Sequence, residues 1–188
     1  MPVFFRLLYS CGMRLSEARL LRIMDVDLEE GVITVTNAKH DRHRLLPVSS
    51  EMLEYLRNYN KTVHFNSLPT DWFFPGYGGR AMTIVNVGHN FRRFLWKAGI
   101  SHGGRGKGPR IHDFRHTMAV HCLRRWVLEG KDLRAYLPVL QAYLGHVSPG
   151  DTAYYLHLTA DLFPNITEQI ELTYGDIIPR LGGSHEDD

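Results

Sequence analysis

The sequence contains only two cysteines, Cys11 and Cys122, among its 188 residues. Two cysteines cannot support a disulfide-rich scaffold, and unpaired thiols are normal in a reducing cytoplasm. No apolar run approaches the ~20 residues of a membrane-spanning helix. The first residues, MPVFFRLLYS, lack the charged n-region and the cleavage site of a signal peptide. We therefore expect a cytoplasmic protein that is neither a disulfide scaffold nor membrane-bound.

The sequence also lacks a strong net charge, internal repeats and low-complexity tracts. Its formal net charge is +2, with 44% apolar and 22% charged residues, which is ordinary globular composition. A chain of 188 residues suits one domain, with or without a tail, and can bury a sizeable core. The composition therefore excludes a disordered chain and indicates no particular partner.

The small net charge results from two segments of opposite charge. Residues 91–140 contain eleven Lys or Arg against three acids, a net charge of +8, whereas residues 151–188 contain eight acids against Arg180 alone, a net charge of −7. The basic segment is typical either of solvated helix faces or of a surface that binds a polyanion. The charge pattern alone leaves both interpretations open.

The hydrophobic periodicity predicts an α+β fold, mainly helical with one small antiparallel sheet. A β-hairpin is expected from strands at 31–36 and 42–48 around a polar turn at 37–41. A flexible basic loop is expected at 101–110 and a turn at 148–150, and Pro138 should kink its helix or lie in its first turn. Helices are predicted at 3–9, 15–23, 50–59, 83–98, 113–128, 133–144, 152–158 and 164–172.

Four segments contain residues with possible chemical roles. They are GMRLSEA (12–18), TNAKHDRHRLLPV (36–48), PRIHDFRHT (109–117) and LGHVSPGDTAYYLH (144–157). Each is weak alone, because an Arg at a helix start is usually a surface residue, a His beside Gly often caps a helix, and a Tyr usually packs. His112 and His116 at i, i+4 resemble a metal-binding pair, but no HExxH pattern or clustered acid completes a site. We therefore expect no metal and no cofactor.

Taken together, the four segments resemble the signature of the tyrosine recombinase (phage integrase) family. That signature is an Arg in a G-x-R-x-S-E context, a hairpin Lys, an H-x-x-R-H-T block, an L-G-H block and then a Tyr. The resemblance extends over residues 4 to 160, in matching order and spacing. It implies the family's mainly helical catalytic domain, with Glu17 as a supporting acid and with a catalytic set of Arg14, Lys39, His112, Arg115, His146 and Tyr155.

The resemblance implies cleavage of a DNA phosphodiester through a 3′-phosphotyrosyl intermediate at Tyr155, without ATP or metal. Two planar guanidiniums, Arg14 and Arg115, suit the charge that develops on the non-bridging oxygens. A tyrosine with an ordinary pKa near ~10 needs help to lose its proton, and His112 is the candidate acceptor. In the family the hairpin lysine, here Lys39, protonates the departing 5′ oxygen. His146 would hydrogen-bond a phosphate oxygen.

Two of these assignments have competitors in the sequence. Tyr154 adjoins Tyr155, although the Tyr-Leu-His context and the spacing favour Tyr155 as the nucleophile. Lys39 competes with Arg42 and Arg44, because a mobile hairpin blurs the match to the family lysine. Both questions stay open at the level of the sequence.

The expected partner is double-stranded DNA, bound by a homo-oligomer that the resemblance implies to be a tetrameric synapse. The basic segment would contact the phosphate backbone and give salt-sensitive affinity rather than sequence choice. The residues expected to bind DNA are Arg42, Arg44, Arg92, Arg93, Arg105, Lys107 and Arg110.

Residues 1–160 are expected to form the catalytic domain, followed at 161–188 by a C-terminal helix and an acidic tail. That tail would either pack on its own domain or dock on a neighbouring protomer through Ile166 and Ile170. We expect this sequence to contain the catalytic half without the family's N-terminal DNA-binding domain, and therefore expect weak DNA binding and poor recombination by this chain alone. Two alternatives are a type IB topoisomerase, disfavoured by the H-x-x-R-H-T and L-G-H contexts, and a DNA-binding accessory protein without cleavage activity.

Overall fold

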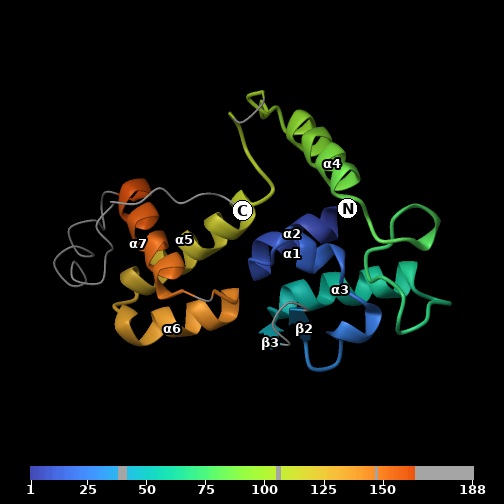
Figure 1. Cartoon of the computed structure of the whole chain (residues 1–188), viewed down its shortest axis with the longest axis horizontal. Coiled ribbons are helices and arrows are strands. Elements are labelled where there is room, and N and C mark those ends of the chain that lie inside the picture. The colour runs from blue at the N-terminus through green and yellow to red at the C-terminus, as the bar shows by residue number, and fades with distance from the viewer. Residues whose placement is uncertain (38–41, 105–106, 147, 164–188) are drawn as a thin grey trace. The chain divides into compact units, whose positions relative to one another are not determined.

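The computed structural model describes residues 1–37, 42–104, 107–146 and 148–163 (Figure 1). The fold divides into two compact units, residues 1–118 and residues 119–188, and the boundary falls within helix α5. The described helices and strands of the first unit are α1 (Pro2–Cys11), α2 (Leu15–Arg19), β1 (Val26–Asp27), β2 (Val32–Asn37), β3 (Arg42–Pro47), α3 (Ser50–Val63) and α4 (Ile84–Lys97), with short 3₁₀ turns at Ile23–Asp25 and Tyr77–Gly79. Helix α5 (Asp113–Leu128) leads into α6 (Leu133–Leu144) and α7 (Pro149–Leu162).

Helix α1 forms the centre of the first unit's core. Phe4, Leu7 and Leu8 are fully buried, at the i, i+3, i+4 spacing that places them on one face, and α1 packs against α3. The helix ends at Gly12, whose φ of 57° lies in the left-handed region that glycine adopts without strain. This sharp end turns the chain directly into the segment that holds Arg14.

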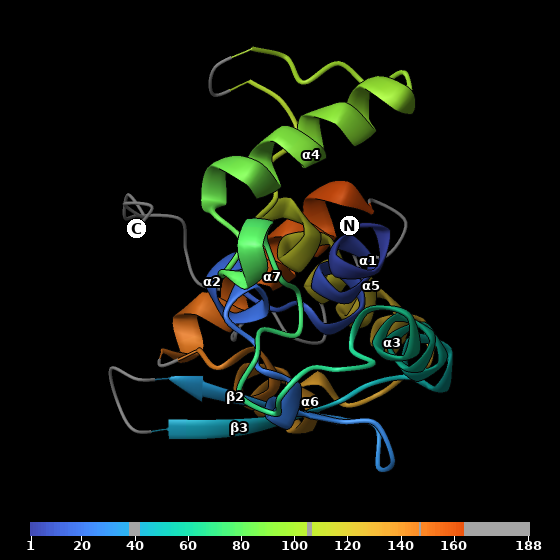
Figure 2. The same cartoon turned by 90° about the vertical axis from the view of Figure 1, so that its right-hand side faces the viewer.

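The three strands form an antiparallel sheet in the order β1-β2-β3, and Figure 2 shows β2 and β3 side by side. Ile33 pairs with Leu46 and Val35 pairs with Arg44. Ile33, Val35 and Leu46 are buried, whereas Leu45 between Arg44 and Leu46 is exposed. Because side chains alternate along a strand, this register places Arg44 on the inner face of the sheet.

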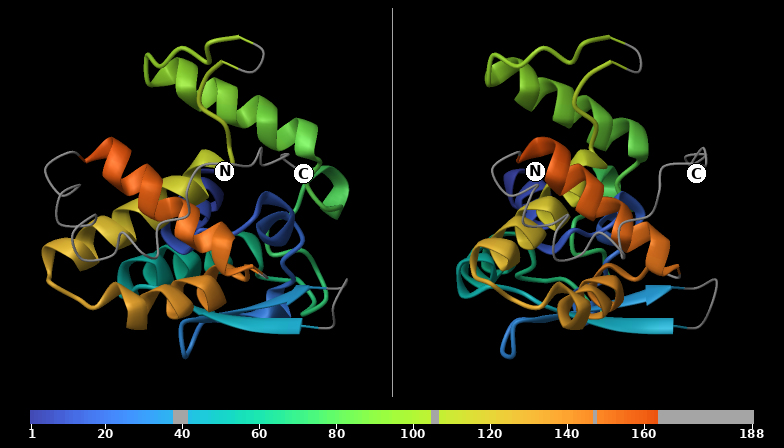
Figure 3. Two further views of the ribbon diagram at one scale, coloured as in Figure 1. Left: turned by 60° about the vertical axis from the view of Figure 1, so that its left-hand side comes forward. Right: turned by 90° about the vertical axis from the view of Figure 1, so that its left-hand side faces the viewer.

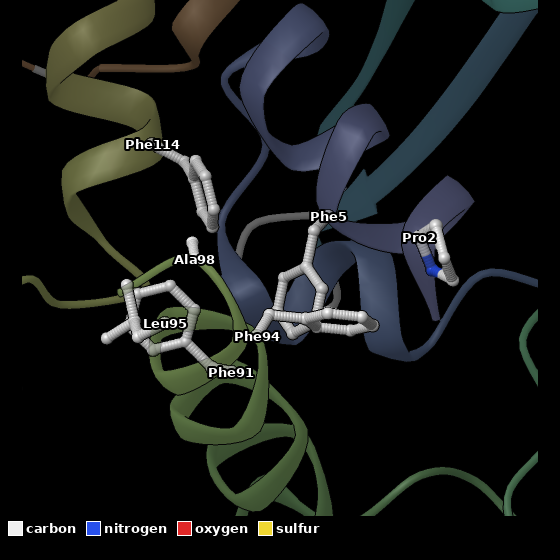
Figure 4. Close-up of a pocket in the computed structure, with 7 residues that line it drawn as sticks. All are labelled: Pro2, Phe5, Phe91, Phe94, Leu95, Ala98 and Phe114. Atoms are coloured by element: carbon white, nitrogen blue, oxygen red, sulfur yellow. The ribbon is translucent and has the colours of Figure 1, made fainter. Parts of the chain in front are cut away.

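Helix α4 packs against the rest of the first unit through a cluster of aromatic rings. The Thr83 side chain caps the helix by accepting a hydrogen bond from the Asn86 amide at 3.1 Å. The Phe5 ring lies 5.8 Å from Phe91 and 5.9 Å from Phe114, between ring centroids. The rings border an open apolar pocket of about 250 Å³, with Phe5 from α1, Phe91 and Phe94 from α4, and Phe114 from the first turn of α5 (Figure 4).

In the second unit, α6 and α7 pack against each other (Figure 3). Leu140 and Leu144 of α6 and Leu156 of α7 are buried. Pro138 lies inside α6, six residues after the Asp132 cap, so it does not mark the first turn. Ser148 caps α7 by accepting from the Gly150 amide at 3.2 Å.

Most predicted elements are confirmed, and the differences have local causes. The helix predicted over 15–23 ends at Arg19, because the Ile23 and Met24 amides donate to the carbonyl oxygens of Asp71 and Pro69 instead. The predicted turn at 148–150 is the start of α7, since proline without an N–H suits the first helical position. Helix α3 continues beyond its predicted end to Val63, and β1 was not predicted.

Some predictions lie outside the described residues. These include the turn around Lys39 and the helix predicted at 164–172. Within the described part of the chain, no helix combines the length and the apolar character needed to cross a membrane.

Candidate active site

Arg14 lies at the junction between the Gly12 turn and α2. Its backbone N–H donates to Glu17 Oε2 at 2.8 Å, and its Nη1 donates to Glu17 Oε1 at 3.0 Å. The Arg14 side chain keeps 39% of its surface exposed, against 12% for Glu17. Glu17 therefore fixes both the backbone and the guanidinium of Arg14 while leaving part of that guanidinium open to solvent.

Glu17 receives a second arginine, Arg44 of β3. Arg44 Nη1 donates to Glu17 Oε1 at 3.0 Å and Nη2 donates to Oε2 at 2.7 Å, a bidentate pair. The Arg44 side chain is 14% exposed. Burial alone would raise the pKa of Glu17, but hydrogen bonds and charge from Arg44 and Arg14 outweigh it and hold that pKa below its ordinary value of 4.5. Glu17 is thus an ionised, largely buried carboxylate between two arginines.

Arg115 joins this region from α5. The residue is only 2% exposed, and its Nη1 donates to the Gly12 carbonyl oxygen at 2.7 Å. Gly12 is two positions before Arg14, so both predicted phosphate-binding arginines are anchored at the same turn. The sequence positions of these arginines are 101 residues apart, and the fold of the first unit brings them together.

His112 lies in the turn that leads into α5, with its ring 4.6 Å from the ring of His116 in a T-shaped arrangement. The pKa of His112 is lowered from its ordinary value of 6.5, first by burial and then by the charges of His116, Arg115 and Arg110, which outweigh the opposing effect of Asp113. A neutral imidazole at neutral pH is the state needed to accept a proton.

In the second unit, Tyr155 and His146 lie together. Their rings stack at 5.8 Å with an interplanar angle of 19°, and Tyr155 is 3% exposed. His146 Nδ1 and Thr152 Oγ1 are 2.8 Å apart, and Thr159 Oγ1 donates to the Tyr155 carbonyl oxygen at 2.7 Å. The Tyr154 ring lies 6.1 Å from that of Tyr155 in a tilted arrangement, and the choice of Tyr155 as the nucleophile stays a prediction.

The other predicted residues fall in two groups. Lys39 and Arg105 lie outside the described residues, as does the side chain of Arg42. Arg92, Arg93, Lys107 and Arg110 are exposed, with Arg93 donating to Asn90 Oδ1 at 2.9 Å and Arg110 ion-paired to Asp113 at 3.2 Å. Among the described residues, no group of three or more His, Cys, Asp or Glu side chains is arranged to hold a metal ion.

Three contributors to the site were not singled out from the sequence: Gly12 as the acceptor for Arg115, Thr152 beside His146, and the pairing of Arg44 with Glu17. The Arg44–Glu17 pair could have been anticipated from the strand pattern. Ile33, Val35 and Leu46 face the core, and alternation along β3 places Arg44 on the same face as Leu46. A cation on an inner face needs an acid partner. The positions of Gly12 and Thr152 depend on contacts that no local pattern encodes.

The mainly helical fold with its small antiparallel sheet is the one implied by the resemblance to tyrosine recombinase catalytic domains. The family comparison agrees: residues 2–161 match the model of the phage integrase family. The chain belongs to the phage integrase family.

Named relatives are recombinases. The chain is 31% identical over 175 residues to a putative integrase/recombinase, y4rB, of Sinorhizobium fredii, covering 92% of this chain and 56% of that protein. It is 32% identical over 154 residues to the tyrosine recombinase XerD of Pseudomonas putida, covering 80% of this chain and 47% of XerD. The crystal structure of XerA recombinase superposes with a TM-score of 0.69 at 28% identity, covering 87% of this chain and 55% of XerA. The chain spans about half the length of the curated relatives it matches.

Proposed function

We propose that this chain is the catalytic domain of a site-specific DNA recombinase that cuts and rejoins strands through Tyr155. The observation that supports this most is the convergence of Arg14 and Arg115 at the Gly12 turn, with Glu17 fixing Arg14. Two arginines held in place before substrate arrives are suited to stabilise a phosphorane-like transition state, because preorganised charge requires little rearrangement during the reaction. The acid leaves part of Arg14 exposed for a phosphate oxygen.

The proposed first step is an in-line displacement at phosphorus. The Tyr155 hydroxyl oxygen forms a bond to the phosphorus, the bond to the 5′ oxygen breaks, and the tyrosine proton goes to neutral His112. Lys39 gives a proton to the departing 5′ oxygen, and His146 donates to a non-bridging oxygen. A 5′ hydroxyl of another strand reverses the step, and the energy of the original diester bond is retained in the phosphotyrosyl link.

The proposed substrate is double-stranded DNA, and the proposed assembly on DNA is a homotetramer. Charge supports the first of these, since Arg92, Arg93, Lys107 and Arg110 are exposed in a segment with a net charge of +8. The family supports the second. Cys11 and Cys122 form no disulfide with each other, which suits the reducing cytoplasm proposed as the protein's compartment.

The test is covalent capture on a pool of nicked suicide duplexes with randomised sequence around the nick. Wild-type protein should yield a DNA adduct that survives denaturation, and Tyr155→Phe should yield none. Tyr154→Phe is the matched control, because it removes the neighbouring hydroxyl and should leave the adduct. Absence of adduct with the wild type, or adduct in Tyr155→Phe, would contradict the proposal.

A further inference from the structure

Arg44 lies in an environment that the stability of the fold does not explain. Its neighbours on the inner face of the sheet, Val35 and Leu46, are apolar and buried. An apolar side chain would suit this position, since replacing a buried ion pair by packed apolar residues is often neutral or stabilising. The sequence instead has a cation there, and the acid that neutralises it is the one that holds Arg14.

We propose that Arg44 is a positioning residue for Arg14, acting through Glu17. This role rests on the proposed function, in which Arg14 contacts the scissile phosphate. Arg44 takes one hydrogen bond to each Glu17 oxygen, at 3.0 and 2.7 Å. That bidentate contact fixes the plane of the carboxylate, which then meets the Arg14 amide and Nη1 at 2.8 and 3.0 Å.

The arrangement divides the charge of Glu17 between two cations. Without Arg44, the carboxylate would interact with Arg14 alone and neutralise the charge that the phosphate needs. It would also lose the contacts that define its orientation. Because a displacement of about 1 Å in a positioning contact can cost roughly 10²-fold in rate, loss of Arg44 should slow cleavage without abolishing DNA binding.

The ion pair also connects the strand that follows residues 38–41 to the first catalytic arginine. Arg44 is on β3, which begins at Arg42, and Lys39 lies in the segment between β2 and β3. Glu17 is on α2, 27 residues earlier in the chain. The Arg44–Glu17 contact therefore links strand β3 to the turn that holds Arg14.

The test uses Arg44→Gln, Glu17→Gln and the double variant in single-turnover cleavage of the suicide duplex pool. We expect Arg44→Gln to slow cleavage about 10- to 100-fold with DNA affinity changed less than twofold. The double variant should be no slower than Glu17→Gln alone, because Arg44 acts through that carboxylate. Multiplying effects, or a loss confined to DNA affinity, would overturn the proposal and make Arg44 a direct DNA contact.

Arg57→Gln is the matched control. Arg57 of α3 also supports the sheet region, donating to the carbonyl oxygens of Leu28 and Glu29 at 2.8 and 3.3 Å, but it does not contact Glu17 in these hydrogen bonds. It should leave cleavage unchanged. If Arg57→Gln slows cleavage as much as Arg44→Gln does, general loosening of the sheet is the cause and the positioning role is wrong.

A second readout is independent of DNA cleavage. In the DNA-free protein, an NMR titration of the Glu17 carboxyl should show that Arg44→Gln raises the Glu17 pKa. Burial raises this pKa, and in the variant only Arg14 remains to lower it. An unchanged pKa would refute the ion pair itself. If wild-type protein forms no adduct but Arg44→Gln raises the Glu17 pKa, the proposed recombinase function is wrong and the Arg44–Glu17 ion pair is confirmed.

Discussion

At the scale of single residues, the proposed chemistry depends on which side chains are charged before DNA binds. Glu17 is ionised between two arginines, and burial together with nearby cations keeps His112 neutral. A neutral imidazole can accept a proton, whereas an imidazolium cannot. If His112 is the proton acceptor, as proposed, its protonation state determines how the cleavage rate depends on pH.

We expect the rate of adduct formation to be level at neutral pH and to fall only below pH 6.5. The pKa of His112 is lowered from 6.5, first by burial and then by neighbouring charges, so the neutral form persists below that pH. The measurement is single-turnover cleavage on both sides of pH 6.5. His116→Gln should move the acid limb to higher pH, because it removes one charge that disfavours the His112 imidazolium. A limb that lies above pH 6.5 in the wild type would contradict the assignment.

At the scale of elements, the turn between α1 and α2 positions the candidate site residues as much as the helices do. The Gly12 turn ends α1, starts the approach to α2 and accepts the Arg115 hydrogen bond. Helix α1 in turn is fixed by apolar contacts, including the ring cluster around Phe5. Substitutions in the Gly12 turn should therefore affect both stability and cleavage, and truncation of Phe5 should lower stability.

Gly12→Ala should lower the free energy of unfolding by about 1–2 kcal/mol, because a Cβ is disfavoured at a φ of 57°. It should also slow cleavage, since the same turn anchors Arg14 and Arg115. Gly130→Ala is the matched control: its φ is 65°, with nothing within 4 Å of an added Cβ. It should cost similar stability at unchanged cleavage rate. Equal cleavage by both variants would show that the Gly12 turn has no special role.

Phe5→Ala should lower the free energy of unfolding by about 3–5 kcal/mol, as expected for truncating a buried aromatic side chain. The loss should be measured by chemical denaturation. Tyr77, which is 97% exposed, provides the comparison, and Tyr77→Ala should change stability by less than about 0.5 kcal/mol. A small effect of Phe5→Ala would mean that α4 is not held by this ring cluster.

The bounds of helices were predicted well where local sequence signals determine them, and poorly where contacts with distant segments determine them. Helices α4 and α6 begin at capping side chains, Thr83 and Asp132. The predicted bounds of α4, α5 and α6 match the structure within a residue. The end of α2 could not be predicted, because Ile23 and Met24 pair with a loop about 45 residues later. The same limit applies to the candidate site, because the motifs singled out Arg14, Arg115 and Tyr155 as candidates but not the Gly12 carbonyl oxygen that accepts from Arg115.

At the scale of the whole molecule, charge is separated along the chain. The net charge of +2 conceals a basic segment at 91–140 and an acidic segment at 151–188. A basic surface that contacts phosphates releases counterions on binding, so DNA affinity should depend on salt concentration according to the number of contacts. The exposed pair Arg92 and Arg93 on α4 offers a direct test.

We expect the double variant Arg92→Gln, Arg93→Gln to reduce the slope of log affinity against log salt by about 2, since each phosphate contact contributes roughly 1. Fluorescence anisotropy with a random-sequence duplex at several salt concentrations measures this slope. Lys61→Gln, on α3 and outside the basic segment, should leave it unchanged. An unaltered slope in the double variant would remove α4 from the DNA-binding surface.

The proposed recombinase function requires that Tyr155 becomes covalently joined to a 3′ phosphate of DNA. The most direct measurement is to digest the trapped adduct with protease and nuclease and to sequence the modified peptide by mass spectrometry. We predict a nucleotide linked through its 3′ phosphate to Tyr155, within the segment Thr152–His157. A phosphate on Tyr154, a link to a 5′ phosphate, or no modified tyrosine would contradict it.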